Sequence, residues 1–107
     1  MSVPAAEGEP RCAVFLAPLA AAGLDHALAA QKQLREAGVG VLMDYEGRSM
    51  KSQMKRADKL GARYVAILGD DELAKGAWTV RDMRESSQEQ VALADLPARM
   101  IERVARG

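Results

Sequence analysis

Apolar runs alternate with amphipathic stretches along the first two thirds of the chain. The runs at Cys12–Ala17, Val39–Tyr45 and Tyr64–Leu68 are continuous or largely apolar, as is typical of strands buried on both faces of a sheet. Between them, apolar residues recur at helical spacing over 24–37 and over 49–61. Strand, helix and strand units of this length favour parallel strands joined by right-handed crossovers.

Each predicted helix has a recognisable start or stop. Gly38 follows the first helix and Gly61 the second, and glycine at these places is a common helix stop. Ser49 is a suitable N-cap for the second helix. The stripe expected to face the sheet from that helix consists of Met50, Met54, Ala57 and Leu60.

The last third of the chain has a different pattern. The segments Ala77–Met83 and Gln88–Leu93 are short and partly polar, and the turn-like residues 84–87 join them. This favours two antiparallel strands that complete one edge of the sheet. Asp95 is expected to cap a last helix that tolerates Pro97 in its first turn. The pattern therefore predicts an α/β domain with five strands and three helices.

Length and composition favour one intracellular domain. The 107 residues, 49% of them hydrophobic, suit a single folded core. Residues 1–10, rich in proline, glutamate and small residues, are expected to be a linker or disordered terminus, which leaves 11–107 as the domain. The single Cys12 allows no internal disulfide and fits a reducing cytoplasm. Neither a signal peptide nor an apolar stretch of about 20 residues is visible, so no membrane contact is expected.

The charges are balanced overall but are unevenly distributed. The chain has 15 basic and 15 acidic residues, yet six basic residues and one acid fall within 47–63. Lys51, Lys55 and Lys59 share one side of the second helix, and Arg48 lies just before it. Such a row of cations is able to follow an RNA phosphate backbone. An ordinary solvated helix face is the competing interpretation.

No catalytic group of residues is visible. His26 is the only histidine, and with one cysteine there is neither a zinc spacing nor a nucleophilic pair. Four acids follow two of the predicted strands and are candidate magnesium ligands: Asp44, Asp70, Asp71 and Glu72. Because the first strand supplies no acid to complete a cage, we predict that this domain holds no metal.

Aromatic residues are few. The chain has four, of which Trp78 and Tyr45 are candidates for stacking on an RNA base. A role in the core or on an edge strand is favoured for both. The domain is therefore not expected to bind single strands mainly by stacking.

One long segment resembles a known family. Residues 41–62 read V-L-M-D-Y-E-G-R-S-M-K-S-Q-M-K-R-A-D-K-L-G-A, and residues 63–73 read R-Y-V-A-I-L-G-D-D-E-L. These residues resemble the C-terminal anticodon-binding domain of bacterial histidyl-tRNA synthetases, and the similarity extends from about Arg11 to the end. The first stretch points to the histidine enzymes, whereas G-D-D-E-L and the later T-V-R-D are shared with threonyl, prolyl and glycyl enzymes.

The resemblance implies a fold and two base-reading residues. It implies a three-layer α/β/α domain around a five-stranded mixed sheet. Relatives hydrogen-bond anticodon bases through residues that match Glu72, in the turn after the third strand, and Arg81, on the next strand. A carboxylate accepts from base amino or imino groups, and a guanidinium donates to base acceptors. An ion pair between Glu72 and Arg81 is the competing interpretation, and both roles are compatible.

The resemblance also implies a parent enzyme. That enzyme would attach histidine to its tRNA with ATP and magnesium, usually as a homodimer, and its catalytic domain would be a partner of this chain alongside the tRNA. This chain carries no class II catalytic core or ATP-binding motif, so no cofactor is expected here. The linker-like first ten residues favour an excised domain. A free-standing regulatory or protein-interaction domain, or the equivalent domain of a threonyl, prolyl or glycyl enzyme, stays open as an alternative.

Overall fold

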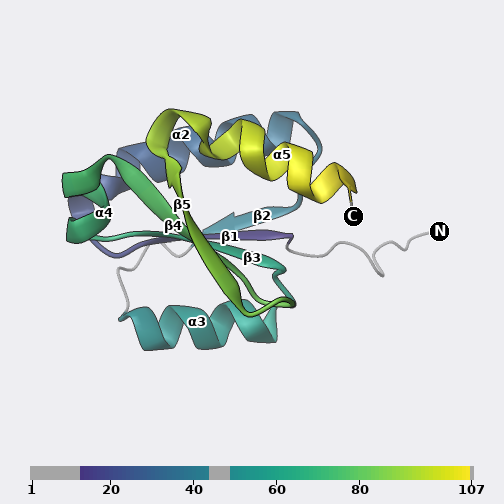
Figure 1. Ribbon diagram of the computed structural model, residues 1–107, viewed down its shortest axis with the longest axis horizontal. Coiled ribbons are helices and arrows are strands. Elements are labelled where there is room, and N and C mark those ends of the chain that lie inside the picture. The colour runs from purple at the N-terminus through teal and green to yellow at the C-terminus, as the bar shows by residue number, and fades with distance from the viewer. Residues whose placement is uncertain (1–12, 44–48, 107) are drawn as a thin grey trace.

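The computed structural model describes residues 13–43 and 49–106 (Figure 1). Its elements, in chain order, are β1 (Val14–Pro18), η1 (Ala21–Gly23), α2 (Leu24–Glu36), β2 (Val41–Met43), α3 (Met50–Lys59), β3 (Tyr64–Leu68), α4 (Asp70–Lys75), β4 (Ala77–Asp82), β5 (Ser87–Ala92), η2 (Leu93–Asp95) and α5 (Leu96–Arg106). Several predictions fall outside the described residues: the linker at 1–10, and the roles of Cys12, Asp44, Tyr45 and Arg48.

The five strands form one mixed sheet in the order β2-β1-β3-β4-β5. β1 pairs in parallel with β2 and with β3, as the crossover pattern predicts. β4 runs antiparallel to β3, and β5 runs antiparallel to β4. The carboxyl ends of the three parallel strands therefore lie at the same edge of the sheet as the start of β4.

Helices cover both faces of the sheet (Figure 1). α2 and α5 pack on one face over the larger hydrophobic cluster, and α3 packs on the other over a smaller one. The larger cluster includes Leu16, Leu34, Trp78, Val80 and Met100, and the smaller one includes Phe15, Ala57, Val65 and Ile67. This confirms the predicted three-layer α/β/α arrangement.

The N-cap predicted for α3 is present, and Met54, Ala57 and Leu60 of the predicted stripe pack against the smaller cluster. The Ser49 hydroxyl accepts a hydrogen bond from the Ser52 N–H at 3.2 Å. Ala57 is buried as expected, whereas Met50 is 41% exposed because it lies in the first turn, at the end of the helix. Gln53 is buried instead. Its position falls within the same stripe, but its polar side chain gave no hydrophobic signal.

A fourth α-helix lies where the sequence predicted only a turn. α4 follows Gly69 directly and ends at Gly76, whose φ of +72° is in the left-handed region that favours glycine. Six residues with three acids in the first turn are too few and too polar to show helical periodicity. The predicted number of three helices was therefore wrong, and Glu72 lies in a helix rather than in a turn.

Asp82 fixes the hairpin between β4 and β5. Its Oδ1 accepts from the N–H groups of Arg84 and Glu85, at 2.9 and 3.1 Å. The Arg63 guanidinium donates to both carboxylate oxygens, at 3.5 and 3.4 Å, and lies over the Tyr64 ring. Burial favours the neutral acid, but the Glu85 N–H, Arg63 and the Arg84 N–H together hold the pKa of Asp82 below its ordinary value.

We expect Asp82→Ala to lower the free energy of unfolding by about 1 to 2 kcal/mol at neutral pH, because several donors lose their acceptor. The pKa of Asp82 is depressed in the folded state, so its stabilisation is complete above the ordinary aspartate pKa of about 3.9 and is lost as the pH falls through the lower folded value. Urea unfolding of both proteins between about pH 7 and pH 3 measures this difference. Asp58→Ala, at an exposed site on α3, is the control, and a difference that stays constant down to the acid end would contradict the assignment.

Candidate nucleic-acid interface

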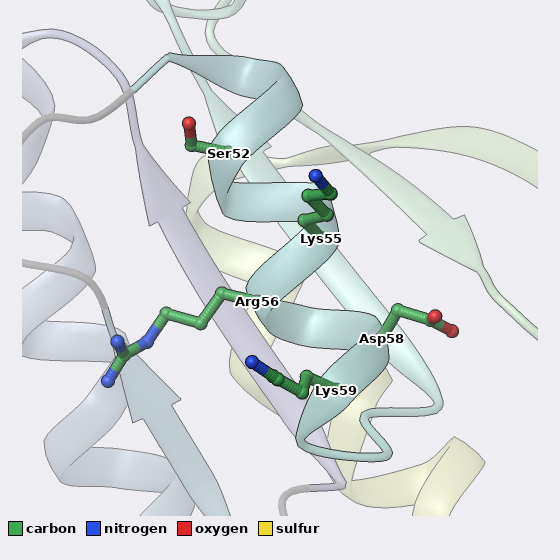
Figure 2. A pocket seen from close by; sticks show the side chains of 5 residues that line it. All are labelled: Ser52, Lys55, Arg56, Asp58 and Lys59. Carbon is green, nitrogen blue, oxygen red and sulfur yellow. The ribbon is translucent and has the colours of Figure 1, made fainter.

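The basic face of α3, formed by Lys51, Lys55, Arg56 and Lys59, is exposed to solvent. Lys55, Arg56 and Lys59, together with Ser52 and Asp58, line an open depression of about 500 Å³. Figure 2 shows Arg56 and Lys59 projecting to one side of the helix and Asp58 to the other. All five lining residues belong to α3, so the depression is a surface of the helix rather than an enclosed pocket.

The three lysines form a line of positive charge along the helix. Successive lysines are four residues apart, which corresponds to about 6 Å along the helix axis. They lie opposite Ala57, which is buried against the sheet. Within residues 13–43 and 49–106, no ion pair joins these lysines to an acid. The charge is therefore available to an anion such as phosphate, and contact of this row with an RNA backbone stays a prediction.

Glu72 is held firmly at the start of α4. Its Oε1 accepts a hydrogen bond from the Gly69 N–H at 2.8 Å, and its Oε2 accepts one from the Thr79 hydroxyl at 2.8 Å. Burial favours the neutral acid, but the bonds from Thr79 and Gly69 and the charge of Lys75 outweigh it and lower the pKa of Glu72. Glu72 is therefore ionised at neutral pH and acts purely as an acceptor.

Arg81 lies on the same face of the sheet as Thr79. In the register of β3 and β4, Arg81 is opposite Val65 and Thr79 is opposite Ile67. Both Val65 and Ile67 belong to the smaller cluster, so this face is the one that α3 covers in part. Arg81 is exposed, and its Cα lies about 7 Å along the strand from that of Thr79, the partner of Glu72.

The structure thus joins Glu72 to Thr79, which lies two residues before Arg81 on the same face of β4. The ion pair that was the competing interpretation is not found in the part of the chain that the structure describes, where the partners of Glu72 are Gly69 and Thr79. Glu72 and Arg81 are instead two separate polar groups, one an acceptor and one a donor.

Three further polar residues on this face were missed by the sequence analysis. Thr79 binds Glu72 directly, and across the hairpin Gln90 pairs with Thr79 while Gln88 pairs with Arg81. Both glutamines are exposed. The two-residue alternation of β4 was the available signal, because it places Thr79 and Arg81 on one face once the strand is accepted.

The remaining candidates do not extend this site. Trp78 is fully buried in the larger cluster, which confirms its core role. His26 is exposed on α2. Across the described ranges, no three histidine, cysteine or acidic side chains gather closely enough to hold a metal ion. Since Asp44 lies outside those ranges, the absence of a magnesium site stays a prediction. Over the same ranges, every helix is too short or too polar to cross a bilayer.

Comparison with known sequences decides the family. The sequence model described as "Anticodon binding domain" matches residues 13–103, which is most of the chain. The chain belongs to this anticodon-binding domain family. The agreement extends to the histidine branch of the family: a histidine–tRNA ligase of Sorangium cellulosum is 43% identical over 85% of the chain, and one of Syntrophotalea carbinolica is 43% identical over 88%.

Solved structures of the family agree with this assignment. The histidyl-tRNA synthetase of Nostoc sp. PCC 7120 superposes with a TM-score of 0.77 and 32% identity, over 89% of this chain and 23% of that chain. The threonyl-tRNA synthetase domain of Cryptosporidium parvum, at 18% identity and a TM-score of 0.71, shares the fold. These comparisons favour a histidine-type anticodon-binding domain over the threonyl, prolyl, glycyl and free-standing alternatives. The chain spans only about a fifth of the length of the curated relatives, 21% and 22% of the two ligases named above.

Proposed function

We propose that this anticodon-binding domain reads the anticodon of histidine tRNA for a histidine–tRNA ligase. The observation that carries the proposal is that an ionised acceptor, Glu72, is bonded to Thr79, two residues before an exposed donor, Arg81, on the same face of β4. Unstacked bases present both donors and acceptors on their edges, and single-stranded loops are where proteins usually read RNA sequence. The 43% identity to histidine–tRNA ligases supports histidine tRNA as the partner.

The residues of the interface divide into two roles. Glu72 accepts from base amino or imino groups, and Arg81 donates to base oxygens or ring nitrogens. Lys51, Lys55 and Lys59 contact phosphates, which positions the RNA without selecting its sequence. Arg48, just before α3, is proposed to join them.

The parent ligase supplies the chemistry. We propose that a catalytic domain of the same protein binds ATP and magnesium, joins histidine to the tRNA in the cytoplasm, and forms the homodimer. In that protein the present domain contributes recognition of the anticodon. Its relatives' names, histidine–tRNA ligase, and the small share of their length that it spans support this division of labour.

Titration of the chain with labelled anticodon stem-loops at fixed salt tests the proposal. We expect the histidine stem-loop to bind at least about tenfold more tightly than loops with altered anticodons, because each lost pair of base contacts costs about 1 to 3 kcal/mol. The same stem with a scrambled loop controls for contacts to the phosphates. Equal affinity for all loops would mean that the domain binds RNA without recognising the anticodon, and this result would overturn the proposal.

A further inference from the structure

Thr79 has a buried hydroxyl that is committed to a single carboxylate. The residue is 8% exposed, in the middle of β4, and its Oγ1 donates to Glu72 Oε2 at 2.8 Å. Seven residues separate the two in sequence, so the bond joins the start of α4 to the strand that follows it. A threonine that served only to fill space at this position would be replaceable by valine, which has the same shape.

The other carboxylate oxygen of Glu72, Oε1, is held by the backbone of Gly69. The Gly69 N–H donates to Oε1 at 2.8 Å, and a Cβ at Gly69 would lie only 3.1 Å from that oxygen. Glycine at this position therefore leaves the space that the carboxylate occupies. With one donor on each oxygen, the carboxylate has a fixed orientation, and each oxygen keeps one further lone pair.

We infer that Thr79 is a positioning residue that aims the free lone pairs of Glu72 at the RNA, on the face that both residues share with Arg81. The inference rests on the proposed function. A long carboxylate side chain that is free to rotate would lose rotamer freedom on binding a base, whereas one already held in place does not. Thr79 touches no base itself and acts through Glu72. The lowered pKa of Glu72 agrees with this arrangement, because the hydroxyl donates to its charged form.

Two sets of variants of the full chain test this role. Thr79→Val and Thr79→Ala remove the hydroxyl, whereas Thr79→Ser retains it. We expect the first two to reduce the preference for the histidine stem-loop over a scrambled loop by about fivefold, the effect of losing one net hydrogen bond. Thr79→Ser should restore the preference to the wild-type value. In a Glu72→Gln background, removing the hydroxyl should cause no further loss of preference.

A second measurement needs no RNA. NMR titration of the Glu72 carboxyl should give a higher pKa in Thr79→Val than in the wild type, because a donor to the charged form is gone. Thr79→Ser should leave the pKa close to the wild-type value.

The outcomes separate this inference from the proposed function. If the wild-type chain shows no preference among stem-loops, the proposed function fails. If the wild type prefers the histidine loop but Thr79→Val and Thr79→Ala keep that preference, or weaken both loops equally, only the role of Thr79 is overturned. The role of Thr79 would also be overturned if loss of the hydroxyl left the Glu72 pKa unchanged. It would likewise be overturned if neither Thr79→Val nor Thr79→Ala folded, because the hydroxyl would then serve stability.

Discussion

Replacing Lys51, Lys55 and Lys59 together with glutamine is expected to weaken binding of every anticodon stem-loop on the order of 100-fold at about 50 mM salt. Each lysine that neutralises a phosphate releases a condensed counterion, so the loss is electrostatic and does not depend on base sequence. The dependence of log affinity on log salt should become shallower by between about two and three units. Titrations of the cognate and scrambled loops across a salt series measure both quantities.

A matched pair of double variants shows whether the loss of RNA affinity depends on where in the domain the charges are removed. Lys55→Gln with Lys59→Gln removes two charges from the basic face of α3. Lys32→Gln with Arg35→Gln removes two exposed charges from α2, which covers the other face of the sheet (Figure 1). We expect only the first pair to change the salt slope. If the α3 variant keeps the wild-type affinity and salt slope, these lysines do not contact phosphate and form an ordinary solvated helix face.

The sheet could be predicted from the sequence because its central strands are buried on both faces. Every residue of β1 and of β3 is buried, and such strands appear as continuous apolar runs with clear ends. β3 was predicted with its observed bounds. β2 begins at Val41, two residues later than predicted, and the end of the predicted strand lies outside the described residues. Leu42 is exposed between two buried residues, as expected of a strand at the edge of the sheet.

α4 could not be predicted, because it is held by the hydrogen bonds of one carboxylate and by the packing of Leu73 rather than by an apolar stripe. None of its residues is fully buried. Glu72 ties it to Gly69 at its own start and to Thr79 on β4, and Gly76 ends it. The side chain that the family resemblance assigns to base reading therefore also holds this helix, and this structural role appears only in the structure.

The ion pair of Asp82 with Arg63 could not be predicted either, because it depends on strand register. Its partner Arg63 is nineteen residues earlier and is brought near by the pairing of Tyr64 with Asp82 across β3 and β4. The pattern predicts that both residues lie in or beside strands, but it does not predict how those strands pair. The bond between Thr79 and Glu72 could not be predicted either, because it depends on how α4 lies against β4.

Glu72→Gln is expected to abolish most of the preference for the histidine anticodon while leaving the fold intact. In the variant, the amide oxygen can accept from the Gly69 N–H, and the amide nitrogen can donate to the Thr79 hydroxyl, so both anchoring contacts are kept. The one free acceptor site on Oε2 is replaced by an N–H donor. A base amino or imino group that bonded the carboxylate then meets another donor, at a cost of about 1 to 3 kcal/mol on the cognate loop.

Arg81→Ala tests the proposed hydrogen-bond donor, as Glu72→Gln tests the proposed acceptor. It removes a guanidinium donor from an exposed strand position, and we expect a loss of about 1 to 3 kcal/mol on the cognate loop with little change in stability. Because the charge of Arg81 also attracts phosphate, a smaller loss on the scrambled loop is expected too. The two losses should therefore differ, and their ratio measures how much of the Arg81 contribution goes to bases.

Asp71→Asn is the matched control for Glu72→Gln, since it removes one negative charge from the same turn of α4 at an exposed position. A carboxylate repels phosphate, so any affinity that Glu72 adds must come from hydrogen bonds to bases or riboses. Both variants should bind the scrambled loop as well as the wild type does or slightly better, and only Glu72→Gln should lose affinity for the cognate loop. Equal behaviour of the two variants on both loops would show that Glu72 acts in this domain as a helix cap and a tether to β4, with base recognition residing elsewhere on the open face around Arg81.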